Sequence, residues 1–179
     1  MVSSSSHAPT VSWHASIWFP YATPKYAFMA WLAMHNRLTV GDRMLLWNVG
    51  IDASCVLCQQ HPETRDHLFF SCRYSREVWS GLAQGLLLSR FTDQWQGIMV
   101  ILADKNLSTL NLYLVRYSFQ VALHSIWRER NNRRHGSQPV LAGHLITIIG
   151  RQIRNQCLIM DSKRIRSYEG ALQLWFSTR

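Results

Sequence analysis

The stretch CVLCQQHPETRDHLFFSC, residues 55–72, holds three of the chain's four cysteines and two of its eight histidines. Its spacing, C-x2-C-x8-H-x4-C, offers four soft ligands within a short segment. A C-x2-C turn places two thiolates on one side of a tight loop, and two later ligands complete a tetrahedron that Zn²⁺ accepts. Three thiolates and one imidazole fill that shell, which is typical of a structural and not a catalytic site. The stretch therefore predicts one structural zinc ion bound by Cys55, Cys58, His67 and Cys72.

Other interpretations of this stretch remain open. His61 competes with His67 as the imidazole ligand, although its place before Pro62, at the apex of a loop, disfavours it. The cysteines are alternatively small buried residues beside a coincidental histidine. An iron–sulfur cluster is disfavoured because one ligand is imidazole and no fourth cysteine is nearby. Glu63 is either a partner that orients the His67 ring or a solvated loop residue.

The rest of the chain is typical of a mostly α-helical protein. Helical spacing of apolar residues and breaks at glycine or proline indicate helices over residues 24–37, from Thr39 to about residue 50, and over 75–88, 92–105, 110–134 and 140–166. In the first of these, Phe28, Trp31, Leu32 and His35 are predicted to form the buried face. We expect a disordered segment over 1–12, a small helical zinc-binding domain over 13–90 and a basic C-terminal region with long helices over 91–179.

The composition indicates the class of protein and the compartment in which it is expected. Hydrophobic residues make up 47% of the 179 residues, which is enough for a packed core. The most apolar stretch, residues 107–127, is interrupted by Arg116 and His124, so no membrane span is expected. Four cysteines, three of them clustered, do not fit a secreted disulfide scaffold, and they favour a reducing compartment such as cytosol or nucleus.

Positive charge is concentrated in the second half of the chain. The net charge is +9, and residues 128–166 hold nine Lys/Arg against two Asp/Glu. Arginine forks suit phosphate, so this segment predicts sequence-indifferent contact with RNA or DNA. The alternative is a solvated helix end whose positive charge complements the helix dipole. The predicted nucleic-acid contacts are Arg128, Arg130, Arg133, Arg134, Arg151, Arg154, Lys163, Arg164 and Arg166.

Residues 13–82 as a whole resemble a known family, the reverse transcriptase zinc-binding domain of plant LINE-type retrotransposon polyproteins. Downstream, IWRERNNRRH at 126–135 resembles a segment that often follows this domain. The resemblance implies a zinc-binding module C-terminal to a reverse transcriptase, with the four metal ligands named above. The residues that carry it are Trp18, Pro24-Lys25, Trp31-Leu32, Asn36-Arg37-Leu38, Thr39, Asp42-Arg43, Gly50, Cys55, Cys58, Glu63-Thr64, His67-Leu68-Phe69-Phe70, Cys72 and Trp79.

The chemistry of such a polyprotein is not expected in this chain. No Tyr-x-Asp-Asp pattern occurs, and ten scattered acidic residues do not form the carboxylate cluster that an RNase H needs. Nucleotide-binding and nucleophile-elbow motifs are also absent. We therefore expect a non-catalytic protein with no small-molecule substrate. The alternatives to a nucleic-acid-binding role are a structural or interaction module for the reverse transcriptase of the parent polyprotein, and an element remnant with no independent role.

Overall fold

The structure, a computed structural model, describes residues 13–179, so the predicted disorder of residues 1–12 falls outside the described residues. The described part is helical, without a strand, as predicted, and it has one isolated bridge between Ser54 and Pro62. None of its helices combines the length and the apolar character that a membrane crossing requires. The elements are α1 (His14–Ile17), α2 (Pro24–Met34), α3 (Gly41–Met44), the π-helix η1 (His67–Ser71), α4 (Arg73–Leu87), η2 (Leu88–Arg90), α5 (Trp95–Ala103), α6 (Thr109–Arg134), α7 (Ala142–Ser162), η3 (Arg166–Tyr168) and α8 (Ala171–Ser177).

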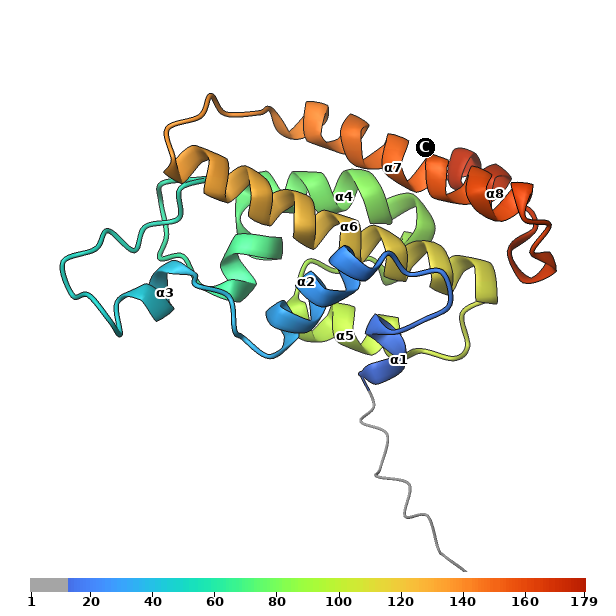
Figure 1. The fold of residues 1–179 in the computed structure, drawn as a ribbon, viewed down its shortest axis with the longest axis horizontal. Coiled ribbons are helices and arrows are strands. Elements are labelled where there is room, and N and C mark those ends of the chain that lie inside the picture. The colour runs from blue at the N-terminus through green and yellow to red at the C-terminus, as the bar shows by residue number, and fades with distance from the viewer. Residues whose placement is uncertain (1–12) are drawn as a thin grey trace, which may run out of the picture.

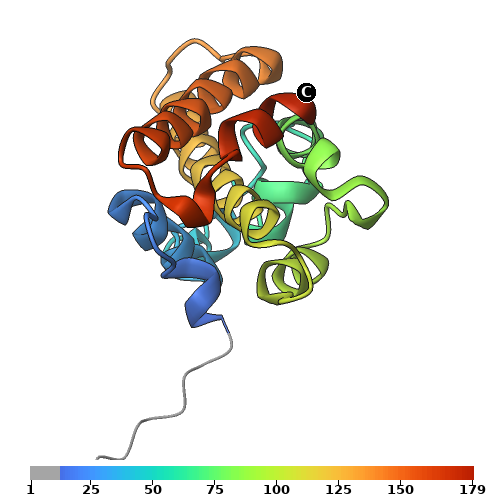
Figure 2. The same ribbon diagram turned by 90° about the vertical axis from the view of Figure 1, so that its right-hand side faces the viewer.

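Helix α6 is the centre of the fold. It begins at a Ser108 cap, whose Oγ accepts the backbone N–H of Asn111 at 3.2 Å. Helices α2, α4 and α7 all pack against it, and α7 also lies along α4 (Figures 1 and 2). The Phe119 ring of α6 stacks on Phe70 of η1 at a centroid distance of 5.9 Å, and Trp79 and Trp95 surround the same pair. The residues next to the predicted metal ligands therefore belong to the main core.

The buried face of α2 differs from the predicted one. Phe28 is 54% exposed, His35 is also exposed, and Trp31 and Leu32 are half-buried. The face toward α6 instead carries Tyr26, Met29 and three alanines at 27, 30 and 33. Small alanine side chains let two helix backbones approach closely, so the contact between α2 and α6 is formed by alanines and not by the largest apolar residues of α2.

The predicted helix from Thr39 is much shorter than expected. It covers only Gly41–Met44, and the apolar residues after it point outward: Leu46 is 77% exposed and Val49 91%. Turns follow to Gly50, and no element within residues 13–179 covers these side chains.

The last predicted helix, 140–166, also ends early. Helix α7 stops at Ser162, and Arg164 has a left-handed backbone (φ 51°) that reverses the chain. The additional helix α8 then packs back against α6 and α7. The core is continuous across residue 90, because α6 and α7 cover the helices that precede it. The division into domains at that residue stays a prediction.

Candidate metal centre

The structure brings Cys55, Cys58, His67 and Cys72 together. One donor atom from each lies within 4.8 Å of all the others. The Cys58 Sγ is 3.2 Å from His67 Nε2, and the Cys55 Sγ is 4.0 Å from the Cys72 Sγ. The three cysteines are buried, and His67 is half-buried. A tetrahedron with Zn–S bonds of about 2.3 Å has edges of about 3.8 Å, so this donor set fits a zinc ion.

The first two ligands come from a tight turn. The Gln59 N–H donates to the Cys55 carbonyl at 2.7 Å, and Gln59 itself has a left-handed backbone (φ 56°). This conformation is uncommon outside glycine, and here it folds the chain around Cys58. The Cys55 N–H donates in turn to the His61 carbonyl at 2.8 Å. The turn therefore presents both thiols to the same side without any strand pairing beyond a single bridge.

The second pair of ligands is joined by the π-helix η1. The Cys72 N–H donates to the His67 carbonyl at 2.7 Å, a bond that spans five residues. The wider π turn places His67 and Cys72, five apart in sequence, at its two ends. Between them, Leu68, Phe69 and Phe70 are all fully buried. The same turn thus supplies two metal ligands and three core residues.

The pKa shifts of three of the donors are compatible with a bound cation. Burial, reinforced by the neighbouring His61, lowers the pKa of His67, which keeps the imidazole neutral at pH 7 with a free lone pair. A hydrogen bond from the Cys55 thiol to Cys72 raises the pKa of Cys55 and lowers that of Cys72. The pair thus retains a proton that a bound metal ion displaces, because metal-ligating cysteines are thiolates.

The structure agrees with the choice of His67 over His61, and it corrects both interpretations of Glu63. His61 is exposed, and although its ring lies 5.1 Å from that of His67, it is outside the ligand cluster. Glu63 is neither a solvated residue nor a hydrogen-bond partner of the His67 ring: it is fully buried, and its Oε1 accepts the Gly41 N–H at 2.9 Å. A Cβ on Gly41 would lie 2.7 Å from the Ala53 carbonyl oxygen, so only glycine allows this approach.

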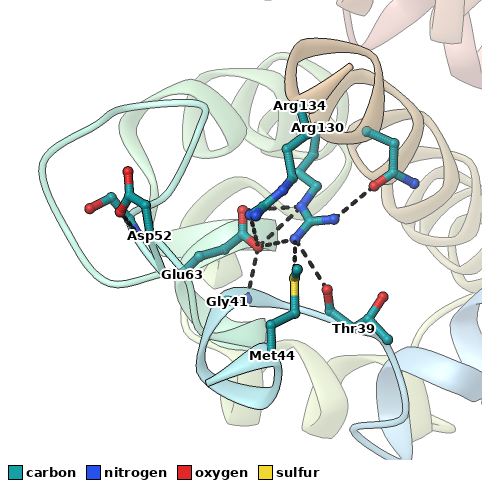
Figure 3. Close-up of polar contacts among 9 residues, drawn as sticks. Thr39, Gly41, Met44, Asp52, Glu63, Arg130 and Arg134 are labelled. Atoms are coloured by element: carbon teal, nitrogen blue, oxygen red, sulfur yellow. Dashed lines mark hydrogen bonds and ion pairs between the residues drawn. The ribbon is translucent and has the colours of Figure 1, made fainter. Parts of the chain in front are cut away.

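The main partner of Glu63 is Arg130 of α6 (Figure 3). Arg130 Nε donates to both carboxylate oxygens at 3.1 Å, and an Nη donates to Glu63 Oε1 and, at 3.1 Å, to the Thr39 carbonyl. The Arg134 Nη1 lies 4.0 Å from the same carboxylate. Both side chains of the central pair are almost fully buried. This pair fastens the metal loop, residues 53–72, to the end of α6.

Arg133 makes a second connection between α6 and the metal loop. Its Nε pairs with Glu129 at 2.7 Å, one Nη donates to the Val140 carbonyl at 3.0 Å, and the other reaches the Leu57 carbonyl at 3.4 Å. Leu57 lies between the first two cysteines. The guanidinium also lies over the Tyr74 ring, 4.5 Å from its centroid.

These contacts correct part of the predicted nucleic-acid surface. Arg130 is 4% exposed, and its donors and those of Arg133 are occupied inside the fold, so neither is available to phosphate. Arg134 is half-buried beside Glu63. The remaining six predicted contacts are exposed, and within residues 13–179 their side chains make no hydrogen bond or ion pair: Arg128, Arg151, Arg154, Lys163, Arg164 and Arg166.

The comparison with known proteins agrees with the metal centre. Residues 2–79 match a protein family described as zinc-binding in reverse transcriptase, and this span includes all four clustered donors. The family resemblance is thereby confirmed for this part of the chain, while the plant LINE-type origin stays a prediction. No curated protein and no solved structure matches the chain.

Proposed function

We propose that the chain is a non-catalytic domain held together by one structural zinc ion. The observation that carries this proposal is the convergence of three thiols and one imidazole within 4.8 Å, in a segment that also supplies core residues. Four protein donors complete a tetrahedral shell, whereas a catalytic zinc keeps a position for water. Bound zinc would fix the conformation of the metal loop, and the contacts of Arg130 and Arg133 with that loop would hold it against α6.

We further propose that the exposed cations contact RNA or DNA without sequence preference. Arg151 and Arg154 lie on α7, and Lys163, Arg164 and Arg166 follow at its C-terminal end. These side chains are exposed and unpaired among the residues that the structure describes, so their charge is available to phosphates. In a larger polyprotein this surface would lie beside the reverse transcriptase and hold its template.

A salt titration of nucleic-acid binding tests this surface. If about five phosphates are contacted, log Kd against log salt should have a slope of magnitude near 3.5 for single strands and 4.5 for duplex. The triple variant Lys163→Gln/Arg164→Gln/Arg166→Gln should weaken binding and reduce the magnitude of the slope by about 2 to 3. Lys105→Gln, which changes an exposed charge in the loop between α5 and α6, is the matched control and should leave both unchanged.

No binding at low salt would reject the nucleic-acid role, whereas an unchanged slope in the triple variant would reject only these three cations as its contacts. Absence of binding would favour the second candidate, a protein-interaction module. The supporting feature is the apolar segment after α3, where Leu46, Trp47 and Val49 are 77%, 65% and 91% exposed. Such a cluster is typical of a surface that another protein covers, here the polymerase of the parent polyprotein.

A further inference from the structure

A shallow depression of about 380 Å³ lies between α7 and α8, and no residue of the metal loop lines it. Its surface is almost entirely apolar, although three arginines contribute to its lining. None of the lining residues is acidic. They are Ile146, Thr147, Gly150, Arg151, Arg154, Trp175, Phe176 and Arg179.

The aromatic residues of α8 play different parts in this depression. Trp175 is buried, and the Arg179 guanidinium lies 3.4 Å from its ring centroid. Phe176, the next residue, is 55% exposed, and its ring contacts no other aromatic ring within residues 13–179. Trp175 therefore anchors α8 to the fold, while Phe176 leaves an open aromatic surface at the side of the depression.

The arginines also divide into two kinds. Arg179 donates to the backbone carbonyls of Gly81 and Leu82 in α4, so it is part of the fold. Arg151 and Arg154 are exposed and lack polar partners among the described residues. Residues three apart on a helix are neighbours on its surface, with Cβ atoms about 5–6 Å apart. Two arginines without polar partners among the described residues therefore line the same depression as the unstacked ring of Phe176.

We propose that this depression is a binding site for single-stranded nucleic acid, in which a base stacks on Phe176 while Arg151 and Arg154 bind neighbouring phosphates. The inference rests on the proposed nucleic-acid contact and identifies the form of nucleic acid that it takes. Single-strand-binding proteins combine aromatic platforms with cationic grooves in this way, because every base has a face that can stack. The bases of a duplex are already stacked on one another and cannot offer that face.

An acidic peptide is the competing occupant, since carboxylates also pair with arginine. A peptide that bound here as an amphipathic helix would need an apolar groove with successive pockets along several turns. The depression here is short and open, with a single exposed ring, and this shape suits one planar base better than the apolar face of a helix.

The experiment measures the fluorescence anisotropy of a labelled oligouridine strand and of a duplex of the same length, titrated with the zinc-loaded chain. Phe176→Ala should weaken single-strand binding by about 5- to 150-fold, the usual effect of losing one stacking residue, and should leave duplex binding unchanged. Phe28→Ala, which removes a similarly exposed ring from α2, is the matched control and should change neither. Phe176 is exposed, so its replacement should leave the fold intact. Thermal melting of the variant verifies this.

Arg151→Gln/Arg154→Gln should weaken single-strand binding and lower the magnitude of its salt slope by about 1.4. If this variant weakens binding while Phe176→Ala does not, the stacking site is wrong but the proposed nucleic-acid contact stands. If the parent chain binds neither strand nor duplex at low salt, both proposals fail. If polyglutamate displaces the single strand as readily as unlabelled oligouridine does, the depression is an acidic-peptide site and the inference is overturned.

Discussion

Replacing Cys58 with serine is expected to abolish zinc binding and the cooperative unfolding transition of the chain. Cys58 contributes one of four donors, and a hydroxyl is a poor substitute for a thiolate on zinc. Structural zinc contributes on the order of 10–16 kcal/mol in finger peptides, as much as the whole stability of a typical domain. The loss extends to the core, because the π-helix that holds His67 also buries Phe69 and Phe70. Thermal melting, monitored by circular dichroism and by tryptophan fluorescence, measures whether the cooperative unfolding transition is lost.

Cys157→Ser is the matched control for this prediction. Cys157 is fully buried in α7 and lies outside the ligand cluster, so its replacement should cost about 1–3 kcal/mol for the buried hydroxyl and leave the zinc content unchanged. A Cys58→Ser variant that melts at the temperature of the parent would show that the metal loop is ordered without zinc.

Arg130→Met is expected to destabilise the chain by about 3–5 kcal/mol, because it removes the hydrogen-bonded partner of the buried Glu63 carboxylate and leaves only Arg134, at 4.0 Å, near that charge. Methionine keeps much of the apolar length of arginine, so the loss comes chiefly from the charge. Urea denaturation of the zinc-loaded protein measures the free energy of unfolding. Arg76→Met is the control: it removes the exposed arginine of a pair with the half-buried Asp93, in which the two charged groups lie 2.8 Å apart, and should cost less than about 1 kcal/mol.

The double variant Glu63→Gln/Arg130→Met separates the pair from its surroundings. Glutamine retains an oxygen that can accept the Gly41 N–H, and neither charge remains. The double variant should therefore be more stable than Arg130→Met alone, so the two changes should not be additive. If Arg130→Met costs no more than Arg76→Met, the pair does not hold the metal loop to α6.

The metal ligands could be predicted from sequence because their geometry is local. Four donors within eighteen residues can reach one ion through two short turns, whatever the rest of the chain does. The π-helical bond between His67 and Cys72 was not predictable in detail, since an α-helical turn also brings residues at such spacing near each other. A weak indication was the run of three apolar residues between the two ligands.

The functions of Arg130 and Arg133 could not be predicted in the same way. In sequence they lie within a basic segment, and their partners Glu63 and Leu57 are far away along the chain. Only the long-range packing of α6 against the metal loop shows that these charges are internal. One signal for the pair was present in the sequence, where acidic residues are scarce. The single glutamate inside the metal loop, followed by threonine, is as suited to a buried ion pair as to solvent.

The longer helices were predictable, and the faces that they bury were less so. The extent of α6 follows from its apolar spacing and its Ser108 cap. The buried side of α2 depends on how closely α6 approaches, which sequence does not state, and the alanines form the contact in place of Phe28. Helix α8 was missed because it is short and its burial comes from α6 and α7.

The most direct test of the zinc-held fold is the metal content of the purified chain, measured by inductively coupled plasma mass spectrometry for the parent and for two histidine variants. We predict one zinc per chain in the parent and in His61→Ala, and a large loss of zinc in His67→Ala, because His67 Nε2 lies in the donor cluster and His61 does not. A folded parent chain without stoichiometric zinc, or loss of zinc in His61→Ala but not in His67→Ala, would contradict this account.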